Sequence, residues 1–131
     1  MSDTTTLGRA FAEAFVAKDD VQMAALLHPE IDFHGLTPQR VWKAKGPEQV
    51  ISDVLQQWLD DVNQEPKLVE VASHSFADTE SLTYRFTGRD AEGPFVCEQH
   101  AYLTGEGGRI NWMRLVCSGF CAVPADMLGP G

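Results

Sequence analysis

Residues 94–121 are the part of the chain that most restricts its fold. Two strand-like runs, rich in apolar and aromatic residues, flank a glycine-rich turn at residues 105–108. Two such runs about a glycine cluster indicate an antiparallel hairpin. Because successive side chains of a strand point to opposite faces, each run has two distinct faces. Both faces carry apolar or aromatic side chains whose burial would be favourable. We expect one face to border a core or pocket and the other to meet a partner subunit.

Alternation along the hairpin assigns the odd-numbered positions to the inner face. Directly opposed residues of an antiparallel pair point to the same side of the sheet, which restricts the possible registers. The compact register pairs Cys97 with Cys117 and Gln99 with Leu115. A register displaced by one residue would instead place His100 on the inner face. The expected inner residues are Cys97, Gln99, Ala101, Leu103, Met113, Leu115, Cys117 and Gly119.

We expect the two inner cysteines to stay reduced. Directly opposed Cβ atoms lie about 4.5–5.5 Å apart, whereas a disulfide prefers about 3.8 Å. The chain has three cysteines and no CxxC pair, so neither a disulfide framework nor a zinc knuckle is indicated. A nucleophilic Cys117 is disfavoured because no cationic partner is implied nearby. Cys97 and Cys117 are therefore expected to pack as small apolar groups.

The segments before the hairpin complete an α+β pattern. Apolar residues recur every three or four positions in three segments, which predicts three helices, with a hinge after the first at residues 18–20. Such one-sided helices can bury their apolar stripes only against one curved, mostly antiparallel sheet. The expected elements are helices at 4–17, 21–27 and 47–62, short strands at 31–35 and 40–45, and long strands at 67–76 and 81–88 before the hairpin.

Composition limits the classes of function. A length of 131 residues predicts a single domain over 1–131, with about 122–131 as a mobile tail. A net charge of −9 with ten scattered basic residues argues against nucleic acid. No apolar run is long enough to span a membrane, and the first six residues are polar, so we expect no membrane association and a cytoplasmic location. The four histidines lack ligand spacing, so no metal is expected.

Four stretches carry a resemblance to a known family: LGRAFAEAFVAKD, ALLHPEIDFHG, GPEQVISDVLQQW and GEGGRINWMRLVCSGF. With them, the chain to about Phe120 resembles the nuclear transport factor 2-like superfamily and, within it, the SnoaL-like proteins. The resemblance implies a cone-shaped, strongly curved sheet wrapped around a long helix, an apolar pocket, and a homodimer formed through the outer sheet face. Proteins of this kind include isomerases, dehydratases, epoxide hydrolases, polyketide cyclases and non-enzymatic binding domains.

The resemblance transfers few catalytic residues. In ketosteroid isomerase-like members, a base, a tyrosine and an acid occupy positions that match Gly35, Phe11 and Gln99 here. Proton abstraction beside a ketone is therefore not expected by that route. The Asp, Arg, Asp set of epoxide hydrolase-like members is also missing. The His and Asp pairs of SnoaL-like cyclases could be imitated by His34 with Asp32, or by His100, if the strand parity differs.

Tyr84 and Gln99 are the predicted catalytic residues, orienting a substrate carbonyl. The alternative for Gln99 is a structural bond to Tyr84 or to backbone. The alternate catalytic residues are His34, Asp32 and His100. However, His100 also suits a dimer face, and the pair of His34 and Asp32 also suits a solvent-exposed strand edge. The residues expected to contact substrate are Phe11, Phe15, Phe33, Trp42, Val54, Trp58, Phe86, Met113, Leu115 and Cys117.

Two classes of function remain open at this point. The first is a cofactor-free enzyme of the lyase or isomerase kind, such as a polyketide cyclase, isomerase or dehydratase, acting on a small apolar, oxygenated or aromatic molecule. The second is a non-catalytic ligand-binding or dimerisation module on the same fold. A buried titratable group inside the fold would favour the first, and an interior filled by the protein's own Trp and Phe side chains would favour the second.

The expected dimer patch comprises Arg85, His100, Tyr102, Trp112, Arg114 and Val116.

Overall fold

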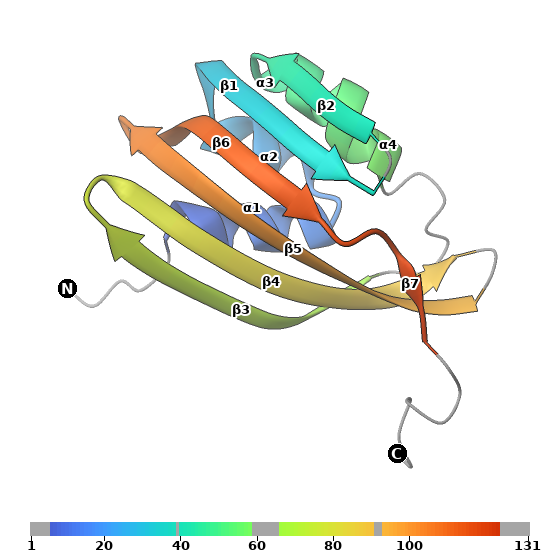
Figure 1. The fold of residues 1–131 in the computed structure, drawn as a ribbon. Helices are drawn as coiled ribbons and strands as arrows, with labels where there is room; N and C mark the ends of the chain where they lie inside the picture. Colours follow the sequence, from blue (N-terminus) through green and yellow to red (C-terminus); the bar gives the residue numbers. More distant parts are fainter. Residues whose placement is uncertain (1–5, 39, 59–65, 91–92, 124–131) are drawn as a thin grey trace.

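The computed structural model describes residues 6–38, 40–58, 66–90 and 93–123, which form an α+β fold. A seven-stranded, mostly antiparallel sheet has its helices on one face (Figure 1). The sheet order is β2-β1-β6-β5-β4-β3, with β7 paired to β5. In chain order the elements are α1 (Leu7–Val16), α2 (Asp20–Leu26), β1 (Leu27–Thr37), β2 (Arg40–Lys45), α3 (Pro47–Gln49), η1 (Val50–Leu55), α4 (Gln56–Trp58), β3 (Lys67–Phe76), β4 (Thr79–Asp90), β5 (Gly93–Glu106), β6 (Arg109–Cys117) and β7 (Cys121–Ala122).

The first two helices are separated by the predicted hinge. The Thr6 side chain caps α1 by accepting a hydrogen bond from Arg9 N at 3.1 Å. After α1, Lys18 adopts a positive φ of 58°, and the Asp19 carboxylate then caps α2 by accepting from Gln22 N at 3.0 Å. One boundary differs from the prediction, because Leu27 begins β1 rather than ending α2. The chain therefore passes from helix to strand without a loop.

The third helical segment is continuous from Pro47 to Trp58 and has a π-helical centre, η1. Its buried side chains include Val50, Val54, Leu55 and Trp58, which follow the three- and four-residue spacing predicted for this segment. Ile51 is also buried, because the wider turn of a π-helix changes which positions face the sheet. The remainder of the predicted helix, to residue 62, lies outside the described residues.

The pairing of β5 with β6 confirms the predicted parity but corrects the register by two residues. Gln99 lies opposite Cys117, not Leu115. The turn has Gly107 and Gly108 at its centre, both with positive φ as a two-residue hairpin turn requires. The register then shifts between Thr104 and Gly105, which restores the parity that buries the odd-numbered residues. Sequence alternation alone could not locate this shift.

The corrected register changes how the two inner cysteines meet. Cys97 and Cys117 are diagonal neighbours rather than a directly opposed pair, with their Sγ atoms 3.5 Å apart. Both thiols are free and buried. His100 lies opposite Val116 and is exposed on the outer face. A displacement by one residue, which would have turned His100 inward, is therefore excluded.

Two further pairings lie outside the sequence prediction. β1 runs parallel to β6, with Phe33 opposite Met113. The predicted tail begins too early, because Cys121 and Ala122 form β7 and pair with Val96 and Phe95. The rest of that predicted tail, from residue 124, lies outside the described residues.

Glu80 of β4 connects the start of α1 to the sheet. Its Oε2 accepts hydrogen bonds from Thr6 Oγ1 at 2.5 Å and Ser73 Oγ at 2.6 Å. Its Oε1 accepts from Gly8 N at 3.1 Å. The Glu80 carboxylate thus accepts hydrogen bonds from the Gly8 N–H, in the first helical turn, and from the hydroxyl of the cap residue Thr6.

We expect Glu80→Ala to lower the free energy of unfolding by about 1–3 kcal/mol, because three donors lose a charged acceptor. Urea denaturation measures this loss. Glu98→Ala is the matched control, since it removes an exposed carboxylate that pairs with Arg85 and should cost less than about 1 kcal/mol. Equal losses in the two variants would show that Glu80 does not anchor the helix.

Candidate functional site

A buried tyrosine and a buried glutamine form a polar pair on the inner face of the sheet. Tyr84 of β4 lies directly opposite Gln99 of β5, and the two are 1% and 0% exposed. The Tyr84 hydroxyl donates to Gln99 Oε1. Burial, with smaller contributions from Cys97 and Cys117, raises the pKa of Tyr84 well above its usual value. Tyr84 therefore stays neutral and acts as a hydrogen-bond donor.

Two donors in this region have no hydrogen-bond partner within the part of the chain that the structure describes. They are Gln99 Nε2 and Trp58 Nε1, and both are buried. A buried polar group without a partner costs about 1–3 kcal/mol, so such atoms are rare and usually meet a water or ligand. Because both groups donate, what they require is a hydrogen-bond acceptor. A carbonyl or ether oxygen on an otherwise apolar molecule fits that requirement.

The Cys117 sulfur is surrounded by hydrogen-bond donors. Gly119 N lies 3.4 Å and Cys97 Sγ 3.5 Å from it. Hydrogen bonding from Cys97, opposed by burial but supported by Gln99 and Gly119, lowers the pKa of Cys117 to about 6. The same contact, with burial, raises the pKa of Cys97. A reactive Cys117 was not expected because the sequence implies no cation nearby, whereas the groups that contact its sulfur are neutral donors.

Aromatic side chains fill the space between the sheet and the helices. Phe15 is central, with ring centroids 5.7 Å from Phe86, 6.2 Å from Trp58 and 6.4 Å from Tyr84. Trp58 also contacts Trp42, at 6.0 Å. Except for the half-buried Trp42, all the residues predicted to contact substrate are buried: Phe11, Phe15, Phe33, Val54, Trp58, Phe86, Met113, Leu115 and Cys117.

A pocket of about 320 Å³ lies beside this core, between α1, α2 and the third helical segment. Phe15 alone of the predicted substrate-contacting residues lines it. Asp20 accepts a hydrogen bond from Gln56 Nε2 at 2.7 Å within this lining. Residues 18–20 were predicted only as a hinge. Lys18 and Asp20 also line this pocket, and the break that they make in the apolar stripe was the one sequence signal of it. The full lining is Ala14, Phe15, Lys18, Asp20, Met23, Leu55 and Gln56.

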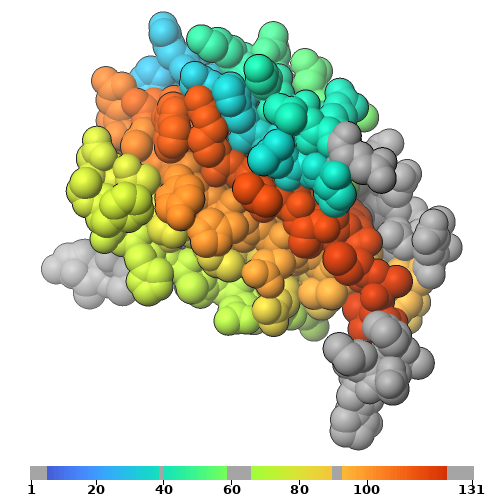
Figure 2. Space-filling model, in the orientation of Figure 1, coloured from blue at the N-terminus to red at the C-terminus, as the bar shows by residue number. Residues whose placement is uncertain are grey.

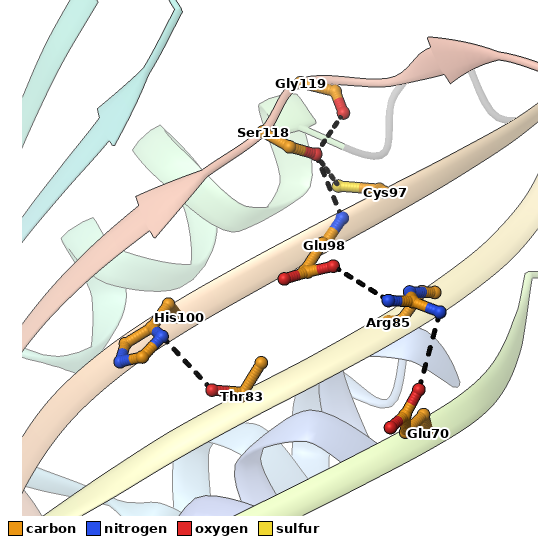
Figure 3. Close-up of polar contacts among 8 residues, drawn as sticks. All are labelled: Glu70, Thr83, Arg85, Cys97, Glu98, His100, Ser118 and Gly119. Atoms are coloured by element: carbon orange, nitrogen blue, oxygen red, sulfur yellow. Dashed lines mark hydrogen bonds and ion pairs between the residues drawn. The ribbon is translucent and has the colours of Figure 1, made fainter.

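The alternate catalytic residues lie on the outer face. His34 Nε2 is 3.5 Å from Asp32 Oδ1, which is also 3.4 Å from Arg114 Nη1. His100 Nδ1 is 3.1 Å from Thr83 Oγ1, on the same face as the Arg85 to Glu98 ion pair (Figure 3). The structure therefore separates Asp32, His34 and His100 from Tyr84 and Gln99.

Comparison with solved structures decides the fold. A protein with a ketosteroid isomerase-like fold from Catenulispora acidiphila, in complex with trimethylamine, has a TM-score of 0.68 and 16% identity, covering 88% of each chain. A nuclear transport factor 2-like protein from Burkholderia thailandensis has a TM-score of 0.67 and 18% identity over 95% of each chain. A candidate polyketide cyclase from Xanthomonas campestris has a TM-score of 0.65 and 20% identity, covering 84% of this chain and 86% of the other. This chain has the nuclear transport factor 2-like fold. No family model and no curated protein matches the sequence.

Within this nuclear transport factor 2-like fold, the positions matched to a ketosteroid isomerase-like base and tyrosine carry Gly35 and Phe11. Phe11 is fully buried. A Cβ added at Gly35 would lie 3.0 Å from the Trp58 ring, so the glycine allows the tryptophan to pack closely on β1. Neither position supplies a titratable group. The polar chemistry of the inner face thus rests on Tyr84, Gln99 and the two cysteines.

Proposed function

We propose that this protein binds a small apolar molecule that carries a hydrogen-bond acceptor, with Gln99 Nε2 as the group that recognises the acceptor. The observation that carries this proposal is the state of Gln99. Its Oε1 is held by Tyr84, while its Nε2 is buried beside the Cys117 sulfur, whose pKa it helps to lower, and has no partner within hydrogen-bond geometry among the described residues. Because Tyr84 fixes the amide, the free N–H group points in a set direction before ligand arrives, which favours binding.

The ligand enters, in this proposal, from the pocket beside α1 and α2. Its volume of about 320 Å³ is at the lower end for small-molecule sites. Phe15 lines that pocket and also contacts the Tyr84 ring, so it is the wall that the two regions share. A change of its rotamer would join the pocket to Gln99. The joined space would then form the apolar, cone-shaped interior that the family resemblance implies.

Binding without catalysis is the form that the described residues favour. No described Asp, Glu, His or Lys lies among the buried residues, and the buried titratable groups are Tyr84, Cys97 and Cys117, so neither a carboxylate nor an imidazole base faces Gln99 among them. Isomerase or polyketide cyclase chemistry is the second candidate, suggested by the descriptions of the structural neighbours from Catenulispora acidiphila and Xanthomonas campestris. It would require Tyr84 and Gln99 to polarise a carbonyl. A cytoplasmic location and the absence of a cofactor stay predictions.

A matched pair of ligands tests the proposal. 1-Tetralone and tetralin share a bicyclic carbon skeleton, but only the ketone has a hydrogen-bond acceptor. We expect 1-tetralone to bind about tenfold more tightly, because one hydrogen bond to a buried, unpaired donor contributes about 1–1.5 kcal/mol. Isothermal titration calorimetry measures both dissociation constants.

Gln99→Leu should remove this preference while keeping the apolar volume. The substitution relieves the desolvation cost of the unpaired Nε2 but leaves the Tyr84 hydroxyl without its acceptor, so stability should fall by about 1–3 kcal/mol, and circular dichroism checks that the variant is folded. Thr83→Val is the control, because it also removes a polar side chain next to Tyr84, but on the outer face. The Thr83 hydroxyl contacts His100 there, so this variant should keep the preference for the ketone. Equal affinities for the two ligands in the unmodified protein, or a ketone preference that survives Gln99→Leu, would overturn the proposal.

We further propose that the protein forms a homodimer through the outer face of the sheet. Figure 2 shows this face, across which β1, β6, β5 and β4 run. Charged groups of both signs lie among the apolar ones, with Arg85 between Glu70 and Glu98. A second copy could therefore match the face without leaving like charges opposed. Its exposed large apolar residues are Leu36, Val41, Phe76, Tyr102 and Val116.

A further inference from the structure

We propose that Cys97 and Cys117 form a redox-active dithiol, in which a hydroperoxide oxidises Cys117 and Cys97 then closes a disulfide. This inference does not rest on the ligand proposed above. It rests on the contact between the two sulfurs and on the position of Cys117 at the end of its strand.

The two sulfurs are already close. Cys97 Sγ and Cys117 Sγ are 3.5 Å apart, and a disulfide needs about 2.0 Å. Cys117 is the last residue of β6, and residues 118–120 leave the regular strand before β7 begins. Gly119 adopts a positive φ of 83° in this connection. Ser118 N still donates to Glu98 O at 2.9 Å, so the backbone beside Cys117 stays attached to β5, and the two side chains must supply the approach of about 1.5 Å that closure requires.

The surroundings assign different roles to the two cysteines. Cys117 Sγ accepts from Gly119 N at 3.4 Å and faces the Cys97 thiol, and both contacts stabilise a thiolate. Ser118 Oγ lies 4.0 Å from Cys97 Sγ and also accepts a hydrogen bond from Glu98 N at 3.0 Å (Figure 3). Cys117 is 6% exposed and Cys97 1%. The thiolate is thus the sulfur that a small oxidant reaches first.

The reaction balances with one hydroperoxide. The Cys117 thiolate attacks the terminal peroxide oxygen, the O–O bond breaks, and the alkoxide leaves and takes up a proton, which gives a sulfenic acid on Cys117. The Cys97 sulfur then attacks the Cys117 sulfur, the S–O bond breaks, and hydroxide leaves as water with the Cys97 proton. Two thiols lose two electrons in total, and the peroxide is reduced to an alcohol and water.

The rate of oxidation should depend on pH. A Cys117 pKa of about 6 implies about tenfold more thiolate at pH 7 than at pH 5, so the rate should rise by about that factor. The other titratable groups that face the sulfur are Cys97 of β5 and Tyr84 of β4, and both have raised pKa values. Cys121 lies near Cys97 at the start of β7 and contributes to its raised pKa. Tyr84 and Cys97 thus remain neutral over this range.

Intact mass measurement after treatment with hydrogen peroxide tests the proposal. The starting protein is Cys121→Ser, which removes the exposed thiol that would otherwise react first. We expect this variant to lose about 2 Da, because disulfide formation removes two hydrogens. Added thiol reductant should restore the original mass.

Two alanine variants in the same Cys121→Ser background identify the roles. With Cys97→Ala, a sulfenic acid should form on Cys117 and react with dimedone, more slowly than in Cys121→Ser because the Cys97 donor is lost and Gly119 N remains. With Cys117→Ala, Cys97 should stay unmodified under the same conditions. Circular dichroism checks that each variant is folded. Cys121→Ser changes only an exposed residue, so the 2 Da measurement does not depend on a substitution in the core. Stepwise oxygen addition to Cys121→Ser without the 2 Da loss, or a disulfide that forms only when Cys121 is present, would overturn the proposal.

Discussion

Replacing Phe15 with alanine is expected to lower the free energy of unfolding by about 3–5 kcal/mol. The side chain is 3% exposed, and its ring meets four other aromatic rings. Its removal leaves a cavity between α1 and the sheet that these rings cannot fill without leaving their present packing. Urea denaturation followed by tryptophan fluorescence measures the loss.

Phe76→Ala provides the matched control. Phe76 is 54% exposed and its ring meets Tyr102 at 6.2 Å on the outer side of the sheet. In the monomeric Val116→Lys background, the same truncation there should cost less than about 1 kcal/mol, because little apolar surface returns to water. Comparable losses at the two positions would contradict a core centred on Phe15.

Phe15→Ala has a second expected effect, on the ligand. If Phe15 separates the helix-side pocket from Gln99, its truncation opens that path, and 1-tetralone should bind at least as tightly as to the unmodified protein. A loss of binding in folded Phe15→Ala would show that the ring forms part of the ligand contact, which would contradict its role as a movable wall.

Replacing Val116 with lysine is expected to convert the proposed homodimer into a monomer. Val116 is 54% exposed on the outer face and lies between Leu36 of β1 and His100 of β5. A two-fold interface contains each substitution twice, so two charges would lose their hydration. We expect the dimer dissociation constant to rise by at least about a hundredfold. Light scattering should then give a mass near 14.4 kDa for the variant and twice that for the unmodified protein.

Val21→Lys makes the same change at a site away from this face. Val21 is 83% exposed on α2, on the helix side of the sheet, and its substitution should leave the dimer intact. The proposed interface would be contradicted if the unmodified protein were a monomer at micromolar concentration. It would also be contradicted if Val116→Lys and Val21→Lys dissociated the dimer equally.

The sequence predicted the faces of the sheet better than its register. Alternation alone placed Gln99 and Cys117 inward and His100 outward, because burial of one face specifies parity strongly. The pairing of Cys117 with Gln99 depends on the shift between Thr104 and Gly105, which restores the parity after the two-glycine turn. Such a shift leaves almost no trace in the alternation of apolar residues.

The candidate site was predicted only in part, for a related reason. The burial of Tyr84 and Gln99 on the inner face was predicted because a polar residue at an inner position of a strand is conspicuous, and their catalytic role stays a prediction. The pocket was missed because its lining comes from three helical segments whose packing no local pattern reveals. The parallel pairing of β1 with β6 was missed likewise, since it joins residues about eighty positions apart. The donors around Cys117 include a backbone N–H, which carries no sequence signal.

A crystal structure of the protein with 1-tetralone tests the central claim most directly. The account expects the ketone oxygen within about 2.7–3.2 Å of Gln99 Nε2, with Tyr84 still donating to Gln99 Oε1. It also expects the Phe15 ring to have left its position between the pocket and Tyr84. A ketone bound among Asp20, Met23 and Leu55 without contact to Gln99, or a Gln99 Nε2 paired with another protein group, would contradict the account.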